Sequence, residues 1–219
     1  MGIEIDLLEN YPKAKRDLNA RAAEKTEADR AIARQFGKDF FDGERRHGYG
    51  GFSYQSRFWQ PVIPTFTKHW DLSPASSVLD VGCAKGFMLH DLKELIPGIT
   101  VRGVDVSEYA IQTSMPDVRQ DVIVANATKL PFADKSFDVV ISINTVHNLD
   151  RNDCGQALKE IERVSRGKSF ITVDAYRNEE EKERMYAWNL TAKTIMSVDE
   201  WIAFFKEVGY TGDYYWFIP

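Results

Sequence analysis

Cysteine is scarce in this sequence of 219 residues: its two thiols, Cys83 and Cys154, do not belong to a Cys-x-x-Cys pair. This spacing indicates neither a structural zinc site nor a disulfide framework, so we expect two buried, reduced thiols. No apolar run approaches the length of a membrane span, and residues 1–15 are too polar for a signal peptide. We therefore expect a cytoplasmic protein with no membrane partner.

An excess of basic residues is also missing. The sequence has 28 Lys and Arg against 33 Asp and Glu, a formal net charge of -5. This balance argues against a broad nucleic-acid-binding face, which would be basic, but it leaves room for a small anionic substrate. Hydrophobic residues make up 43% of the chain, which is enough for a core, and the length fits one compact domain with an appendage.

The first 70 residues are rich in charge and aromatic side chains. Thr26 and Asp29 form a capping-box pattern at the start of a helix that we expect to end at Gly37. A second helix is expected from about Pro61 to residue 70. Four glycines lie among the basic and aromatic residues 42–54 between them, which indicates a loop. We expect residues 1–70 to form a helical arm with a lid loop, ahead of a main domain over 71–219.

From residue 77 onward, short apolar runs alternate with amphipathic stretches. The runs predict strands at 77–81, 100–105, 121–125, 137–143, 169–174 and 214–218, and the stretches predict helices at 88–95, 158–164 and 197–208. Strands that are apolar on both faces and alternate with helices indicate an α/β fold with a parallel sheet covered by helices. Such sheets bind ligands beyond the carboxyl ends of their strands.

The segment from Val78 to Leu89 carries the sharpest signal. A strand leads into a turn with Gly82 and Gly86 and then into a helix, whose first N–H groups have no partners within the helix. Glycines there would let a ligand approach the backbone closely. Asp105 ends the next strand, 19 residues after Gly86. Its carboxylate could accept hydrogen bonds from both hydroxyls of a ribose.

These motifs resemble those of the class I S-adenosylmethionine (SAM)-dependent methyltransferases, whose first motif reads Asp-x-Gly-x-Gly-x-Gly. Asp80, Gly82 and Gly86 match it, and Ala84 replaces the middle glycine. The resemblance covers about residues 75–175 and implies a Rossmann-like, doubly wound, mostly parallel sheet with SAM as cofactor. The dinucleotide fingerprint is not met. The cofactor contacts that the resemblance implies are Asp80, Gly82, Cys83, Ala84, Gly86, Asp105, Val106, Asn126, Ala127 and Asn144, with Tyr49 near the sulfonium.

Three residues are candidates for catalysis. His147 follows the fourth predicted strand and could remove the proton of an acceptor hydroxyl, or it could be a structural cap. Asn144 could position a hydroxyl, and Asp174 could share a hydrogen bond with His147. The several acidic ligands of a metal site are missing here, so we expect no metal.

Substrate contacts are expected from the lid loop and from the end of the fifth strand, at Arg45, Arg46, His47, Tyr54, Tyr176 and Arg177. The arginines favour an anionic small-molecule acceptor, such as a nucleotide-activated or phosphorylated sugar. Methylation of nitrogen or carbon is an open alternative to a hydroxyl acceptor. A different alternative is that the chain is a noncatalytic interaction protein with the same fold. The chain could be a monomer or a homodimer.

Overall fold

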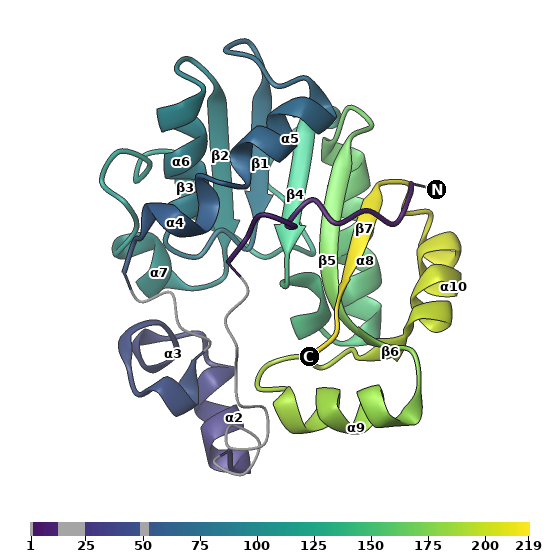
Figure 1. Cartoon of the computed structure of the whole chain (residues 1–219). Helices are drawn as coiled ribbons and strands as arrows, with labels where there is room; N and C mark the ends of the chain where they lie inside the picture. The colour runs from purple at the N-terminus through teal and green to yellow at the C-terminus, as the bar shows by residue number, and fades with distance from the viewer. Residues whose placement is uncertain (1, 13–24, 49–52) are drawn as a thin grey trace.

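The centre of the protein is a seven-stranded sheet, seen in a computed structural model that describes residues 2–12, 25–48 and 53–219. The strand order is β3-β2-β1-β4-β5-β6, with β7 also paired to β5, and every pairing between these strands is parallel. The chain first moves outward from β1 to β3 and then crosses back to β4. This creates a switch point between β1 and β4 (Figure 1).

Six of the seven strands lie close to their predicted positions, and β6 was not predicted. The strands are β1 Ser77–Val81, β2 Thr100–Asp105, β3 Val122–Val124, β4 Val139–Ile143, β5 Ser169–Tyr176, β6 Met196–Ser197 and β7 Asp213–Phe217. The Rossmann-like α/β architecture is therefore confirmed. The prediction for β4 begins two residues too early, because Phe137 makes only an isolated bridge with Ser165.

Helices cover both faces of the sheet, and alternate residues of β1 point into two separate cores. Leu79 and Val81 pack in the core under α8 (Arg151–Val164) and α10 (Val198–Val208). Val78 packs in the other core, under α5 (Ile63–Trp70) and α6 (Phe87–Leu95). Figure 1 shows α5 in front of the sheet and α8 behind it. The short helices α4 (Ser56–Trp59) and α7 (Glu108–Gln112) complete this part.

The N-terminal region folds into more pieces than the sequence indicates. The capping box of Thr26 and Asp29 is present, but α2 (Glu27–Ala33) ends before Gly37, and Gly37 is instead the N-cap of α3 (Lys38–Asp42). A turn of 3-10 helix, η1 (Arg45–His47), lies within the expected loop. We call α2, α3 and η1 the cap, and Figure 1 shows it on the side where the parallel strands end.

The two ends of the chain meet at one edge of the sheet. The backbone N–H of Ile5 donates to the carbonyl of Tyr214 (3.0 Å), and Tyr214 donates back to Ile3 (3.1 Å). The first residues are thus an added edge segment rather than a free polar arm. The sequence did not indicate α9 (Glu179–Trp188), in which only Met185 and Trp188 are buried. None of the helices in the described ranges is long and apolar enough to cross a membrane.

Candidate active site

The turn between β1 and α6 has a left-handed backbone at every second residue. The φ angles are 89° at Gly82, 49° at Ala84 and 74° at Gly86. A Cβ at Gly82 would lie 2.1 Å from Thr145 Oγ1, and one at Gly86 would lie 2.8 Å from a methyl group of Val118. Protein atoms, and not an open space for a ligand, therefore lie beside both glycines. The left-handed backbone and this close packing explain why glycine stands at these positions.

Asp105 fixes the turn to the end of β2. One carboxylate oxygen accepts the backbone N–H of Ala84 (2.8 Å) and the other accepts that of Ser107 (2.9 Å). Burial raises the pKa of this carboxyl, while these backbone donors oppose the rise. Each oxygen keeps a second acceptor site, so two ribose hydroxyls could still bind. Asp105 is thus placed for the role that the sequence suggests.

Asp80 is a buried carboxyl without a partner. Asp80 lies on β1 and is 5% exposed, and no other described residue makes a hydrogen bond or ion pair with its carboxyl group. Burial, and next the nearby charge of Asp105, raise its pKa to about 8. A buried carboxylate is costly until a positive charge or hydrogen-bond donors reach it. SAM carries a sulfonium and an ammonium group, so the residues present fit this cofactor.

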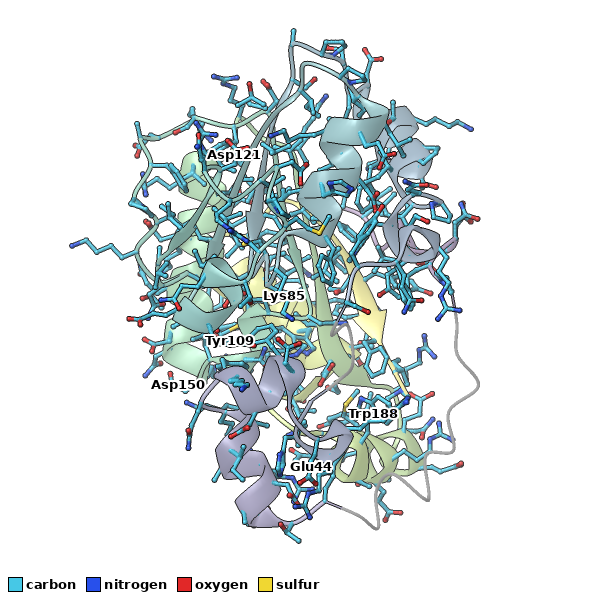
Figure 2. All side chains as sticks on the ribbon, turned by 90° about the vertical axis from the view of Figure 1, so that its left-hand side faces the viewer. Glu44, Lys85, Tyr109, Asp121, Asp150 and Trp188 are labelled. Atoms are coloured by element: carbon cyan, nitrogen blue, oxygen red, sulfur yellow. The ribbon has the colours of Figure 1, made fainter. Side chains whose placement is uncertain are left out.

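The cap is held against this turn by one carboxylate. Asp42, the last residue of α3, accepts Lys85 Nζ (2.6 Å) and the hydroxyl of Tyr109 (2.7 Å). The hydroxyl of Ser107 donates to the carbonyl of Phe36 in the same region. Figure 2 shows Lys85 and Tyr109 side by side above the cap. These contacts place the cap over the ends of β1 and β2.

Two further expected cofactor contacts flank Asp80 and Asp105. Cys83 is buried, and burial raises the pKa of its thiol well above the usual value, so it is an unreactive packing residue. Val106 has 57% of its surface exposed directly after Asp105. An apolar side chain in that position could contact the flat face of an adenine ring.

The asparagines after β3 and β4 are engaged locally. Asn126 Oδ1 accepts both the backbone N–H (2.9 Å) and the hydroxyl (3.0 Å) of Thr128, beside the half-buried Ala127. Asn144 has a left-handed backbone, and its Oδ1 accepts the hydroxyl of Thr172 (2.9 Å). The side-chain amide nitrogens of Asn126 and Asn144 could still donate hydrogen bonds to a ligand.

His147 and Asp174 lie together, as expected, but the bond differs from a carboxylate–imidazole contact. The backbone N–H of Asp174 donates to Nδ1 of His147 (2.9 Å), whereas Nε2 is 3.8 Å from the Asp174 carboxylate. Burial lowers the pKa of the imidazole, although the Asp174 charge opposes this. The ring is therefore neutral, with its proton on Nε2. In this arrangement it offers no free lone pair, and a base role requires it to release the Asp174 amide.

The residues expected in the lid hold the cap together. Arg46 Nε lies 3.5 Å and His47 Nε2 lies 3.0 Å from the same oxygen of Asp29. Hydrogen bonds from Thr26 are the main cause that lowers the pKa of Asp29 to about 2. Arg45 is exposed on η1. An ionised Asp29 is thus the centre of the cap.

Tyr54 packs on α6. Its hydroxyl donates to Asp91 (2.5 Å), and its ring lies edge-on to His90 at 4.7 Å between centroids. His90, Asp91 and Glu94 are close enough to one another to bind a metal ion. His90 already pairs with Asp117, and Glu94 accepts from Gln60. Tyr49 lies outside the described residues.

Tyr176 and Arg177 contact the neighbouring helices. The hydroxyl of Tyr176 donates to Glu200 (3.4 Å), and Lys182 Nζ lies 5.5 Å from the Tyr176 ring centroid. Arg177 faces Glu181 across 3.6 Å. These contacts connect the end of β5 to α9 and α10.

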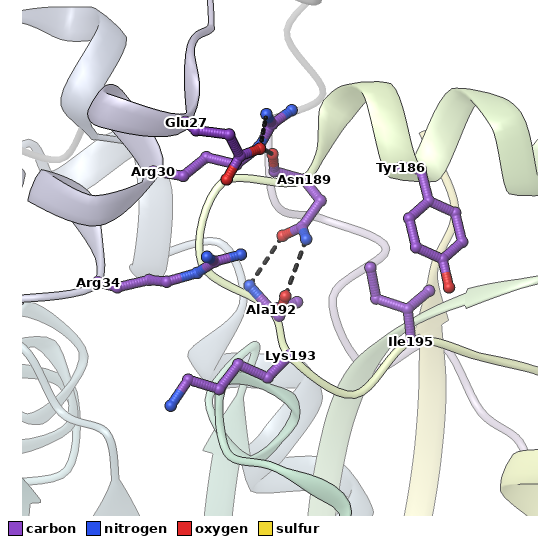
Figure 3. A pocket seen from close by; sticks show the side chains of 8 residues that line it. All are labelled: Glu27, Arg30, Arg34, Tyr186, Asn189, Ala192, Lys193 and Ile195. Atoms are coloured by element: carbon purple, nitrogen blue, oxygen red, sulfur yellow. Dashed lines mark hydrogen bonds and ion pairs between the residues drawn. The ribbon is translucent and has the colours of Figure 1, made fainter.

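A pocket of about 610 Å³ opens between the cap and the segment that follows α9. It is lined by Glu27, Arg30, Arg34, Tyr186, Asn189, Ala192, Lys193 and Ile195 (Figure 3). The backbone N–H groups of Lys193 (3.0 Å) and Thr194 (2.9 Å) donate to the carbonyl of His147, so the segment that lines the pocket is bonded to the main chain of that residue. Sequence reasoning missed this pocket. Its one local signal is the pair of arginines one helical turn apart in α2.

A family model described as a methyltransferase domain matches residues 79–173. This range runs from β1 to β5 and includes the turn, Asp105 and His147. The match therefore covers the turn and the strand ends around it, whereas the cap, Asp174 and the pocket lie outside the matched range.

Several curated relatives are more than 30% identical to part of this chain. A tRNA (carboxymethyluridine(34)-5-O)-methyltransferase of Arabidopsis thaliana is 32% identical over 145 residues, which cover 65% of this chain and 33% of the relative. A demethylmenaquinone methyltransferase of Roseiflexus sp. is 36% identical over 91 residues, 40% of this chain and 37% of the relative. The chain spans about a third of the length of these relatives.

A solved structure shows the same fold. It is the Haemonchus contortus phosphoethanolamine N-methyltransferase 2 in complex with phosphomonomethylethanolamine and S-adenosylhomocysteine. It matches with a TM-score of 0.57 and 18% identity, over 81% of this chain and 44% of that one.

Proposed function

Because the chain belongs to the class I SAM-dependent methyltransferases, we propose that it transfers the methyl group of SAM to a hydroxyl oxygen of a small molecule, without a metal. The observation that carries this proposal is the carboxyl of Asp80, which is buried beside Asp105 and the glycine turn and has no partner among the described residues. A cationic nucleoside satisfies both carboxyls, since its positive charge suits Asp80 and its ribose suits Asp105.

Bound SAM supplies a methyl group on a good leaving group, so the protein's tasks are alignment, water exclusion and proton removal. Asp105 binds the ribose hydroxyls, and Asp80 faces the positive charge. Val106 and the amide group of Asn126 contact the adenine. The backbone from Gly82 to Gly86, including Cys83 and Ala84, sets the shape of the turn. Asp42 keeps the cap over this edge.

We assign the acceptor to the pocket between the cap and the segment that follows α9. The acceptor hydroxyl must lose its proton as the new bond forms, and His147 with Asp174 is a buried titratable pair whose main chain bonds to the segment that lines the pocket. The imidazole exchanges the Asp174 amide for the acceptor hydroxyl and takes its proton. Asp174, whose pKa burial raises, then stabilises the imidazolium. Asn144 positions the hydroxyl.

The acceptor carries a negative charge in this proposal, and a nucleotide-activated or phosphorylated sugar is one such molecule. Exposed Arg45 reaches it from η1, and Tyr176 and Arg177 reach it from the end of β5 by exchanging Glu200 and Glu181 for the acceptor. Arg46 and His47 contribute by keeping the cap folded around Asp29.

Calorimetry with purified protein tests the cofactor assignment. We expect SAM and S-adenosylhomocysteine to bind and NAD not to bind. Asp105→Ala should weaken SAM binding by at least tenfold, about 1.4 kcal/mol. Asp121→Ala is a matched control, because Asp121 pairs with Arg102 and Lys93 at the far end of β2 and β3. Equal SAM affinity in the Asp105→Ala variant and the parent would overturn the assignment.

An RNA acceptor is the second candidate, because the relative from Arabidopsis thaliana is named as a tRNA methyltransferase. RNA binding that weakens steeply with salt would favour it. A noncatalytic protein of this fold would show no thermal shift with SAM. Acceptors with nitrogen or carbon differ from the main proposal only in the product.

A further inference from the structure

The pocket between α2 and the segment 189–195 has an excess of positive charge. Three cations, Arg30, Arg34 and Lys193, line it against one carboxylate, Glu27. The chain as a whole has a net charge of -5, so this balance is local. Clustered cations in a hollow raise the local concentration of anions.

Within the described part of the chain, two of these three cations have no side-chain partner. Arg30 donates to Glu27 (2.7 Å) and to the carbonyl of Asn189 (3.2 Å). Arg34 and Lys193 make no ion pair or side-chain hydrogen bond within the ranges that the structure describes. Arg34 Nε is buried as well as unpartnered. A buried donor without an acceptor is unfavourable, and an anion in the pocket would supply that acceptor.

We propose that this pocket is an anion-binding subsite, in which Arg34 and Lys193 bind a phosphate or carboxylate group of the methyl acceptor. The forked donors of a guanidinium match the oxygens of either group, and the ammonium adds a flexible charge. The identification of the anion as part of the acceptor rests on the proposed function. The binding of an anion does not.

The frame of the subsite is already rigid. The Asn189 side chain donates to the carbonyl of Ala192 (2.8 Å) and accepts its N–H (2.8 Å), which closes the loop (Figure 3). Lys193 is then fixed to His147 through the backbone, and Arg30 ties α2 to Asn189. A preformed site loses little entropy when it binds.

The size and position fit an acceptor that is anionic at one end. About 610 Å³ holds a phosphate together with a sugar-sized or larger body. Tyr186 and Ile195 offer apolar surface on the side of α9 (Figure 3). Because Lys193 of the pocket is bonded to the main chain of His147, an anion held by Arg34 and Lys193 brings the acceptor to the side of the segment that carries the proposed base.

Anion binding can be measured without any activity. We would titrate the protein with inorganic phosphate and with citrate, and follow both calorimetry and thermal unfolding. Arg34→Gln and Lys193→Gln should each weaken binding of the preferred anion by about tenfold. Arg184→Gln is the control, because exposed Arg184 pairs with Glu180 on α9. The stronger of the two anions identifies the group as phosphate or carboxylate.

The outcome separates the two proposals. If Arg34→Gln loses anion binding but retains SAM binding, the subsite is supported, and Asp105→Ala should show the reverse pattern. If SAM fails to bind but Arg34-dependent anion binding remains, only the methyltransferase assignment fails. Saturable binding that is equal in the parent and the Arg34→Gln, Lys193→Gln double variant would overturn the subsite, as would no binding to the parent. Circular dichroism checks that each variant is folded, and Arg34→Lys should retain part of the affinity.

Discussion

The backbone amide of Asp174 donates to Nδ1 of His147, so the position of the imidazole is set by the main chain of β5. The Trp201 indole donates in turn to the Asp174 carbonyl at 2.9 Å, which holds this stretch of β5 against α10. His147 is therefore a rigidly placed residue. Its neutral form is stabilised by burial.

Replacement of His147 tests its role as a base. We expect His147→Ala to lower kcat by about 10²- to 10⁴-fold, because general-base catalysis contributes that much, while SAM affinity changes little. His90→Ala is the control, since His90 lies on α6 and pairs with Asp117. If the two variants lose the same small factor in kcat, His147 is a structural residue.

The pH dependence of activity should follow His147. Burial holds the pKa of its imidazole below the usual 6.5. The base form therefore persists below pH 6.5, and kcat should fall only at more acidic pH. The same protonation makes the folded state less stable as the pH falls, because the unfolded state takes up the proton first. A kcat profile that rises only above pH 7.5 would contradict this prediction.

Stability without cofactor should fall as the pH rises across the neutral range because of Asp80. The pKa of this carboxyl is about 8 in the folded protein, whereas the ordinary pKa of an aspartate is 3.8. The folded protein therefore keeps a proton on Asp80 up to about pH 8. The folded state thus binds more protons than the unfolded state between these values, so this group lowers the free energy of unfolding as the pH rises. Urea unfolding at pH 5 and pH 8 should show a smaller decrease for Asp80→Asn than for the parent.

Binding of SAM should release this proton, because a positive charge favours the ionised carboxylate. Calorimetry at pH 7 in two buffers with different ionisation enthalpies measures the proton count. Asp80→Asn should abolish the release. Proton release that is unchanged in that variant would show that another group titrates.

The turn after β1 should tolerate glycine at Ala84 but not alanine at Gly82. Gly82→Ala adds a left-handed strain of about 1–2 kcal/mol and a clash with Thr145, so we expect a loss of at least 2 kcal/mol in the free energy of unfolding. Ala84→Gly relieves strain but makes the unfolded chain more flexible, so the change should stay within about 1 kcal/mol. Urea unfolding curves of the two variants test this difference.

Asp42 should control the attachment of the cap. Asp42→Asn weakens the contacts with Lys85 and Tyr109, so amide hydrogen exchange in α2 and α3 should become faster while β1 and β4 remain protected. Asp39→Asn on the same helix is the control, because Asp39 is exposed. Equal exchange in both variants would show that other contacts hold the cap.

The sequence by itself determined the sheet and the glycine turn with its two carboxyls. Strand runs and glycine turns depend on residues that are close in the chain, so Gly82 and Asp105 could be placed at strand ends from the sequence, and the resemblance to the methyltransferase motif added Asp80. The capping box of Thr26 and Asp29 could be predicted for the same reason, because its residues are close in the chain. Helix α9 was missed because only Met185 and Trp188 face the core, which leaves almost no apolar period to detect.

The tertiary structure alone decided which side chains meet across long stretches of chain. Arg34 and Lys193 share a pocket because the cap docks on the segment after α9. Likewise, Arg46 and His47 are occupied by Asp29, and Tyr54 turns to α6. Charge and hydrogen-bonding capacity are visible in a sequence. The partner that satisfies each group is set by packing, because many partners are chemically equivalent until the fold selects one.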